Sequence, residues 1–539
     1  MEIENLDHLG LVAALVDEIG LVELTDELLA PHPLNHISPG QVVKAMILNG
    51  LGFVSAPLYL FSEFFDGKPV EHLLGAGITA AHLNDDRLGR VLDQLFECGT
   101  TLFFLKVAMQ AVIRFGVSVS QCHLDSTSFT LDGEYPSVSG SKTALETGEP
   151  QTIEICRGYS RDHRPELKQF LVNLICSADG GIPVWFKVGS GNETDSQTFA
   201  GLMRAFAEQW QTPALMVADA AFYSEPNLQQ VGSLPWLSRV PQTLKAAQTW
   251  IDSTLDSPTE MLCEVEGYRL WEQRQRYGGV DQRWILVESP HRTQSQDWLK
   301  PLEKQEKGLQ RSLRQLWSQV FACKPDAMDA LMRFQDSLTG YTLTQVALVS
   351  VAAKRPPGRP KRARPSNSPA LGYQWQATLE RTAEYEAQCQ QRHRRFILAT
   401  NVLDEDAYPA ERLLREYKAQ QHVERGFCFL KDPLFFTSSV FVKKPQRVEA
   451  LALVMALTLL VYSLGQRKLK AQLAQADDTV LDQKQRPTRN PTFRWILQKF
   501  QAIHLVSIAS SQQVSNLSEE RSKIIRLMGF PACRYYLLN

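Results

Sequence analysis

The 539-residue sequence lacks the cysteine pattern of a zinc module or of a disulfide framework. Its nine cysteines are scattered along the chain, and no two of them form a Cys-x-x-Cys pair. Paired spacing is what structural zinc sites usually need, and dense, regular cysteines are typical of small secreted domains. The distribution therefore favours a globular protein of a reducing cytoplasm.

Signals for export or membrane insertion are also missing. Residues 1–7, Met-Glu-Ile-Glu-Asn-Leu-Asp, are acidic where a signal peptide is basic and then apolar. The longest apolar run, residues 450–464, contains Thr458 and Ser463 and is shorter than the ~20 residues that span a bilayer. We expect a buried helix there, no membrane partner and a cytoplasmic location.

An excess of basic residues is the third absence, since the formal net charge is −2. Affinity for DNA comes largely from basic groups that displace counterions, so the average composition does not suggest a DNA partner. The basic residues are nevertheless clustered, which is compatible with nucleic-acid binding along particular faces. The clusters are Lys354, Arg355, Arg359, Lys361, Arg362 and Arg364, followed by Arg392, Arg394 and Arg395.

Two isolated acids stand where short apolar strands are expected to end. Asp125 lies in Gln-Cys-His-Leu-Asp-Ser-Thr-Ser-Phe, and Asp219 ends the run Ala-Leu-Met-Val-Ala-Asp. Strands that close on an acid place that acid at the open edge of a sheet. Asp179 and Asp195 also lie near strand ends and compete with Asp219, while Asp132 and Asp162 are weaker alternatives.

A third acid belongs to a polar stripe on a predicted helix. At about 100° per residue, Tyr417, Gln420, Glu424 and Lys431 fall on one narrow face, which is too polar for a core. If Asp125, Asp219 and Glu424 converge, their oxygens suit hard divalent ions such as Mg²⁺ or Mn²⁺. Two such ions in one site can activate water and stabilise the leaving oxygen of a phosphoryl transfer.

The order of these three acids, with the tyrosine and lysine around the glutamate, resembles the DDE transposases of bacterial insertion sequences. The likeness covers roughly residues 115–470 and is to the group with the signature Tyr-x2-Arg-x3-Glu-x6-Lys. The stretch Gly158–Gln169 is also similar to that group. One position departs from the signature, because Gln420 stands where the family has arginine, and glutamine supplies no charge to a phosphate.

The resemblance implies a function and a set of partners. It implies metal-dependent cleavage at transposon ends and strand transfer to target DNA, by a homodimer acting on double-stranded DNA at the bacterial nucleoid, with hairpin ends as a further hypothesis. Tyr417 and Lys431 would contact phosphates, with Gln420 in the arginine's place. Separately from the resemblance, His163, with Arg161 and Arg164 beside it, is either structural or part of a further phosphate contact. A transposase-derived DNA-binding protein that does not cut, or a cellular ribonuclease-H-like nuclease, are the alternatives.

The periodicity predicts an α/β protein with five segments. Residues 1–114 form a helical N-terminal domain, which either only packs on the rest or binds the DNA end. Residues 115–242 and 396–470 form the two parts of a ribonuclease-H-like core, and 243–395 form a β-rich inserted domain. Residues 471–539 are a C-terminal helical region.

The insert contains aromatic residues between arginines, and a basic linker. Trp271 and Trp284 lie in a predicted hairpin with Arg269, Arg274, Arg276 and Arg283, where core packing competes with base stacking. By resemblance, Trp271, Trp284 and Trp298 are candidates to stack on a flipped base. The proline-rich linker 354–368 carries Arg359, Lys361 and Arg362 and is either an extended minor-groove segment or a solvated basic loop.

Overall fold

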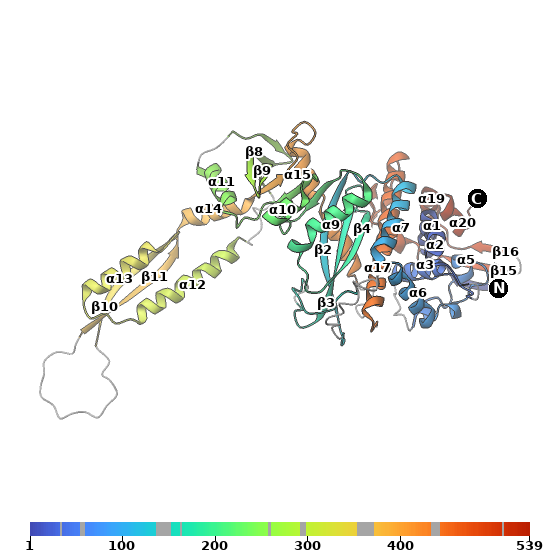
Figure 1. The fold of residues 1–539 in the computed structure, drawn as a ribbon, viewed down its shortest axis with the longest axis horizontal. Coiled ribbons are helices and arrows are strands. Elements are labelled where there is room, and N and C mark those ends of the chain that lie inside the picture. The colour runs from blue at the N-terminus through green and yellow to red at the C-terminus, as the bar shows by residue number, and fades with distance from the viewer. Residues whose placement is uncertain are drawn as a thin grey trace, which may run out of the picture. The chain divides into compact units, whose positions relative to one another are not determined.

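The structure is a computed structural model, and the chain in it divides into two compact units (Figure 1). The first contains Met1–Arg239, Gln275–Arg283 and Ala399–Asn539, and the second contains Val240–Arg274 and Trp284–Leu398. The residues described are 1–32, 35–53, 60–135, 152–161, 164–256, 260–290, 298–352, 371–432, 442–508 and 511–538.

A mixed sheet of nine strands has the order β4-β3-β2-β5-β6-β12-β9-β8-β7. In the first unit, β2 (Gln121–Leu131) pairs antiparallel with β3 (Lys168–Ser177), and β3 pairs antiparallel with β4 (Pro183–Ser190). On its other side β2 is parallel to β5 (Leu215–Ala218), which is parallel to β6 (Trp236–Arg239). Strands are present at both predicted runs, and β5 ends just before Asp219 as expected. The prediction that a strand ends at Asp125 is wrong, because β2 continues to Leu131 and pairs with β3 along almost its whole length.

Two helices make the crossovers that parallel strands require. The helix α9 (Asp195–Trp210) leads from β4 to β5, and α10 (Glu225–Val231) leads from β5 to β6. β5 pairs with the first residues of β2, so the carboxyl end of β5 lies beside the middle of β2.

Two of the N-terminal helices, α3 and α6, begin at side-chain caps. Ser38 and Gln41 form a reciprocal capping box at the start of α3, and the Asn84 side chain accepts from the Arg87 N–H at 2.9 Å. The helices are α1 (Leu9–Ile19), α2 (Leu21–Leu29), α3 (Pro39–Gly50), α4 (Phe61–Phe64), α5 (Val70–Leu74), the 3₁₀ helix η2 (Ala80–His82), α6 (Asp85–Glu97) and α7 (Thr100–Phe115).

A single apolar core joins these helices to the sheet and to the C-terminal part of the chain. At its centre is α17 (Pro445–Gln475), which packs on α6, α7 and β4 (Figure 1). Among the described helices, α17 alone is by itself apolar and long enough to cross a membrane, but 83% of its most apolar window is buried. The predicted buried helix at residues 450–464 is confirmed.

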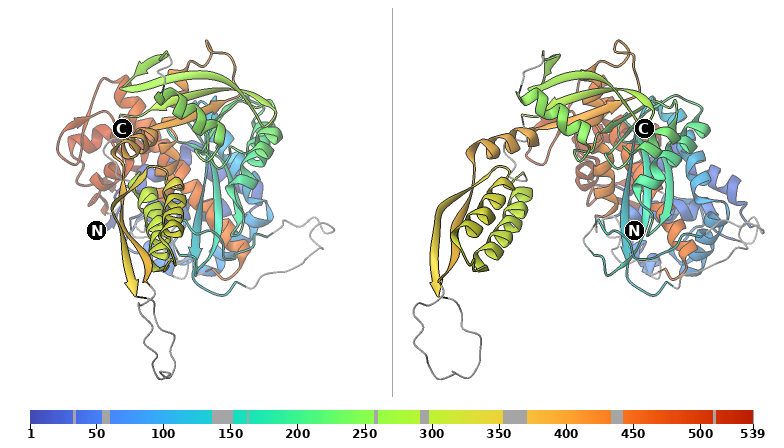
Figure 2. Two further views of the ribbon diagram at one scale, coloured as in Figure 1. Left: turned by 90° about the vertical axis from the view of Figure 1, so that its left-hand side faces the viewer. Right: turned by 60° about the vertical axis from the view of Figure 1, so that its left-hand side comes forward.

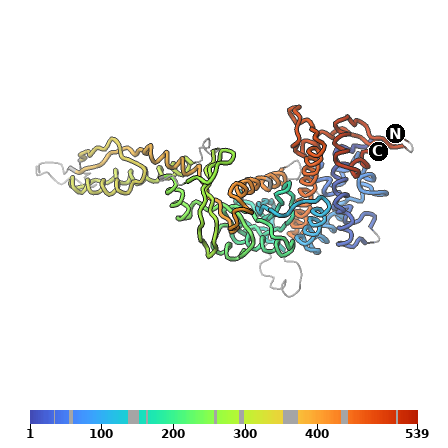
Figure 3. The backbone as a smooth tube through the Cα atoms, turned by 90° about the horizontal axis from the view of Figure 1, so that it is seen from above, coloured from blue at the N-terminus to red at the C-terminus, as the bar shows by residue number. Residues whose placement is uncertain are grey.

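The sequence predicted a helical C-terminal region, but this region also contains strands. Its strand β15 pairs with β1 (Glu2–Asn5) at the opposite end of the chain, which brings the two termini close together (Figure 3). The elements of the C-terminal region are β13 (Val480–Leu481), β14 (Pro487–Thr488), α18 (Phe493–Lys499), β15 (His504–Ile508), β16 (Ser511–Val514), α19 (Glu519–Met528) and α20 (Phe530–Tyr535).

The second unit contains both helices and strands, whereas the sequence predicted a β-rich insert. Within it, two helices pack against a long hairpin around Trp375, whose indole N–H donates to the Ala327 carbonyl at 2.6 Å (Figure 2). Its elements, some shared with the first unit, are α11 (Lys245–Asp256), β7 (Cys263–Val265), β8 (Tyr268–Tyr277), β9 (Val280–Glu288), α12 (Leu299–Ser318), α13 (Lys324–Asp336), β10 (Tyr341–Ala352), β11 (Leu371–Arg381), α14 (Ala383–Arg394) and β12 (Arg395–Thr400).

Candidate active site

Asp125 and Asp219 are neighbours on adjacent parallel strands. The observed register of β2 and β5 pairs His123 with Val217. Continuing that register by two residues places Asp219, just after β5, level with Asp125. Adjacent strands lie about 5 Å apart, so the two carboxyl groups are neighbours, one in the middle of β2 and the other at the end of β5.

Both carboxyl groups are held in a poorly solvated position. The Ser126 N–H donates to Asp125 Oδ1 at 2.7 Å, and the Ala221 N–H donates to Asp219 Oδ1 at 3.0 Å. Burial raises the pKa of Asp125 to about 7, and the Asp219 and Asp195 carboxylates add to the increase. Burial, with Asp195, also raises the pKa of Asp219. Each aspartate would therefore be stabilised by a nearby cation.

Arg161 places a positive charge beside these acids when neither DNA nor a metal ion is bound. Its guanidinium forms an ion pair with Asp195 at the start of α9 and lies 3.8 Å from Asp125 Oδ1. The sequence predicted that Arg161 contacts DNA and considered Asp195 only as a competitor of Asp219. The structure instead places Asp195 beside both aspartates and Arg161 between acids, an arrangement that no local pattern encodes.

The segment that carries Arg161 is fixed by a tight chain crossing. The buried Gln169 side chain donates to the carbonyl oxygens of Tyr159 at 3.1 Å and Gly191 at 2.8 Å. A Cβ atom at Gly158 or Gly191 would overlap a backbone oxygen, so only glycine allows this approach. The crossing positions the guanidinium of Arg161 over the acids.

The helix that carries Glu424 is interrupted, whereas the sequence predicted one helix over residues 409–431. The structure has α15 (Ala410–Lys418) and α16 (Gln421–Leu430), with a break at residues 419–420. The Gln420 N–H donates to the Tyr417 carbonyl at 3.2 Å, a tightened turn. Gln420 is buried at this break, so its predicted phosphate contact is not in place, while Tyr417 is half-buried.

Two contacts give the position of α15 and α16 along β2. Glu416 hydrogen-bonds to Gln121 near the start of the strand, and Lys431 Nζ lies 5.6 Å from the centre of the Phe129 ring near its end. Residues 121 to 129 of a strand extend about 26 Å, and residues 416 to 431 of a helix extend about 22 Å. Strand and helices therefore run in the same direction with matched length, and their midpoints are Asp125 and Glu424.

This structure does not bring all three predicted acids together as metal ligands. Asp125 and Asp219 provide paired oxygens whose charges repel, which suits a divalent cation. Glu424 is level with Asp125 but exposed to solvent. Among the residues that the structure describes, no three His, Cys, Asp or Glu side chains are grouped so as to hold a metal ion.

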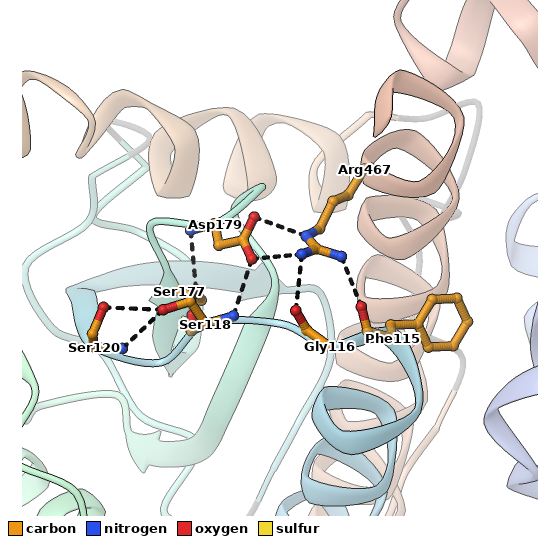
Figure 4. A network of polar contacts seen from close by, with 7 residues as sticks. All are labelled: Phe115, Gly116, Ser118, Ser120, Ser177, Asp179 and Arg467. Atoms are coloured by element: carbon orange, nitrogen blue, oxygen red, sulfur yellow. Dashed lines mark hydrogen bonds and ion pairs between the residues drawn. The ribbon is translucent and has the colours of Figure 1, made fainter. Parts of the chain in front are cut away.

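Asp179 has a structural role and does not replace Asp219. Arg467 of α17 donates to both of its oxygens, at 2.8 and 2.6 Å, and to the carbonyl oxygens of Phe115 and Gly116 (Figure 4). Burial alone would raise the pKa of Asp179, but the bonds from Arg467 and the Ser118 N–H outweigh it and lower the pKa. Asp132 is exposed just beyond β2, and Asp162 lies outside the described residues.

Several predicted DNA contacts lie elsewhere or are already engaged. Arg164 pairs with Glu166 on the surface. Arg283, from the predicted aromatic and basic hairpin, is fully buried and donates to the Tyr408 carbonyl at 2.7 Å. His163, the linker 354–368 and its residues Arg359, Lys361 and Arg362 lie outside the described residues.

The three tryptophans differ in accessibility. Trp284 is fully buried against the ring of Trp250, and Trp271 is buried beneath Arg395, so in this structure neither ring has an open face for a base. Core packing, the competing interpretation of the pattern, accounts for both. Trp298 is half-buried and lines a cavity of about 390 Å³ within the second unit, with Tyr385 among the other lining residues.

The raised pKa of Asp125 predicts a pH dependence of stability. An acid whose pKa is higher in the folded than in the unfolded chain stabilises the fold while protonated, so that contribution is lost as pH rises from its ordinary value of 3.8 to about 7. We expect the metal-free protein to lose thermal stability between about pH 5 and 8, and Mg²⁺ to restore more of it at the higher pH. Thermal unfolding with MgCl₂, against NaCl of equal ionic strength, measures this. Stability that rises over this range, with no effect of Mg²⁺, would contradict the electrostatics of the site.

Comparison with known proteins identifies the family. A model of a domain of unknown function (DUF4277) matches residues 1–109, and the model of the transposase DDE domain matches residues 122–461. A search of curated proteins found no match. One similar solved structure is a piggyBac transposase synaptic complex with hairpin DNA, at 9% identity and a TM-score of 0.37, with 93% of this chain and 83% of that chain covered. Since the transposase model spans more than half of the chain, the protein belongs to the transposase DDE domain family.

Proposed function

We propose that this transposase cuts DNA at the ends of its element and joins the freed strands to target DNA, with Asp125, Asp219 and Glu424 as the metal ligands. The placement of Asp125 and Asp219 at matched positions of adjacent parallel strands carries the proposal. The strand order β4-β3-β2-β5-β6, three antiparallel strands followed by two parallel ones, supports a ribonuclease-H-like core.

Bound Mg²⁺ or Mn²⁺, two ions per site, would supply Lewis-acid stabilisation of the reacting phosphate and a more acidic water. The protein contributes the position of its acids and their poor solvation, which strengthens their hold on cations. Arg161 balances the charge of Asp125 and Asp195 before DNA arrives, and its guanidinium can then turn to a phosphate. Lys431 and Tyr417 are the proposed phosphate contacts along the helices beside β2.

The remaining expectations belong to the same proposal. The protein would act as a homodimer on double-stranded DNA in the bacterial cytoplasm, with the inverted-repeat ends and the target as its DNA partners. A hairpin at the cut end is a further step of this proposal.

Cleavage of end-labelled DNA that carries the inverted repeats flanking the gene tests the proposal. We expect cuts at the repeat ends with Mg²⁺ or Mn²⁺ and none with EDTA. The Asp132→Asn variant is expected to cleave as the wild-type protein does, because this exposed aspartate lies just past β2 and outside the acid group. Cleaved products that are all linear would remove the hairpin step.

Two other outcomes point to other functions. Specific binding of the repeats without any cut would favour a transposase-derived DNA-binding protein. Cutting that ignores the repeats would favour a general nuclease with the same metal chemistry.

A further inference from the structure

The second unit contains a basic cavity that is separate from the acids of the first unit. Its volume is about 410 Å³. Three of its lining side chains are arginines, Arg269 of β8, Arg394 at the end of α14 and Arg395 at the start of β12. Glu288, at the end of β9, is the one carboxylate among the described lining residues.

All three guanidinium groups converge on that single carboxylate. Arg395 donates to Glu288 Oε2 at 2.9 Å. Arg269 donates to Oε1, and Arg394 lies 3.7 Å from the same oxygen. The Glu288 carboxylate therefore neutralises one of the three guanidinium charges. Two positive charges remain uncompensated among the lining residues.

The inner part of the cavity is rigid. The side chains of Arg395 and Glu288 are only 9% and 8% exposed. Arg395 also donates to Thr254 Oγ1 at 3.0 Å, and its guanidinium lies 5.1 Å from the centre of the Trp271 ring. A buried, hydrogen-bonded pair of this kind keeps its geometry when a ligand arrives.

The outer part remains open to a ligand. The Arg269 and Arg394 side chains are 47% and 29% exposed. Arg394 Nε is itself buried, and no hydrogen-bond acceptor for it exists among the described residues. A buried donor without an acceptor is costly, so an anion that enters here gains a charged partner and satisfies that donor.

We propose that this cavity binds a phosphate group, held between Arg269 and Arg394. The planar guanidinium fork matches two phosphate oxygens, and two uncompensated positive charges match a phosphate better than a neutral ligand. The phosphate is that of a DNA strand or of a free phosphate ester. The DNA source rests on the proposed function, whereas the anion site does not.

The test uses the full-length protein and the double variant Arg269→Gln, Arg394→Gln, which leaves the buried Arg395 and Glu288 pair intact. Arg333→Gln is the matched control, because this arginine of α13 is exposed, belongs to the same unit and does not line the cavity. Calorimetric titration with inorganic pyrophosphate forms one arm. Titration with double-stranded DNA at several salt concentrations forms the other.

We expect the double variant to bind pyrophosphate at least 10-fold more weakly. Its plot of log affinity for DNA against log salt is expected to be shallower by about 0.9 for each phosphate that the variant no longer neutralises. The control variant retains both values.

The remaining outcomes separate the anion site from the proposed function. Weaker pyrophosphate binding with unchanged DNA binding supports the site and assigns it to free phosphate esters. If wild-type protein binds pyrophosphate here but no DNA, the site stands and the proposed function fails. Unchanged titrations in both arms overturn the inference.

Discussion

Glu424→Gln is expected to lower the rate of DNA cleavage by more than about 100-fold, because loss of a direct metal ligand exceeds the 10 to 100-fold typical of outer partners. Glutamine keeps the size of the side chain and removes the charge that holds the cation. Because Glu424 is exposed, the substitution removes no packing, so fold and DNA affinity are expected to stay at wild-type values.

This prediction is demanding because the third acid is not grouped with the other two in the structure. Glu424 is level with Asp125 along β2 but exposed, and we propose that a turn or shift of α16 brings it to the aspartates when DNA and metal ions bind. The break at residues 419–420 provides a place for that movement, and a cavity of about 380 Å³, lined in part by Glu416 and Ala419, lies beside it. A change at a break between two helices is a common hinge.

Glu411→Gln is the matched control, since this glutamate is on the preceding helix and outside the stripe. Single-turnover cleavage of labelled DNA gives the rate, and filter binding gives the affinity. Cleavage at wild-type rate by Glu424→Gln would show that another group completes the metal site, and Asp195, beside both aspartates, would be the next residue to test.

The local patterns predicted the presence of strands β2 and β5 for a physical reason. A short apolar run that ends on an acid specifies both a buried strand and the place where it stops, and Asp219, directly after β5, follows that rule. Asp125 does not, because β2 continues to Leu131 and the acid lies within the strand. Such features depend on residues that are close in sequence.

Features that depend on distant partners were missed. The pairing of β1 with β15 joins the two ends of the chain, and nothing near Glu2–Asn5 encodes it. Arg161 pairs with Asp195, and Arg283 of the predicted hairpin is buried and donates to the Tyr408 carbonyl, and neither partner can be predicted from nearby residues. A basic residue reveals its charge in the sequence, but its partner is fixed only by the fold.

The helices of the second unit had a signal that was overlooked. In α12, Leu302, Leu309, Leu313 and Leu316 recur at helical spacing, and Leu309, Leu313 and Leu316 belong to the small core of this unit. The prediction of a β-rich insert rested on the aromatic hairpin and the proline-rich linker and did not use this leucine pattern. The hairpin residues Trp271 and Trp284 are buried, as tryptophans in strands commonly are.

Asp125→Asn is expected to abolish cleavage and at the same time to stabilise the fold. At pH 8 the wild-type carboxylate is ionised although burial opposes its charge, whereas asparagine is neutral and can keep the hydrogen bond from the Ser126 N–H. A pKa raised from 3.8 to about 7 corresponds to a gain of at most about 4 kcal/mol, because each unit is worth about 1.4 kcal/mol and the neighbouring acids share the effect.

Thermal unfolding of the metal-free variant at pH 8 and pH 5 measures this, together with cleavage in Mg²⁺. The gain is expected to be larger at pH 8, since at pH 5 the wild-type carboxyl group is mostly protonated. Mg²⁺ is expected to stabilise the wild-type protein and not the variant. An aspartate that served only the fold would show the reverse, with Asp125→Asn lowering stability at both pH values. Activity lost while stability rises is the combination that marks Asp125 as a residue kept for chemistry at a cost to the fold.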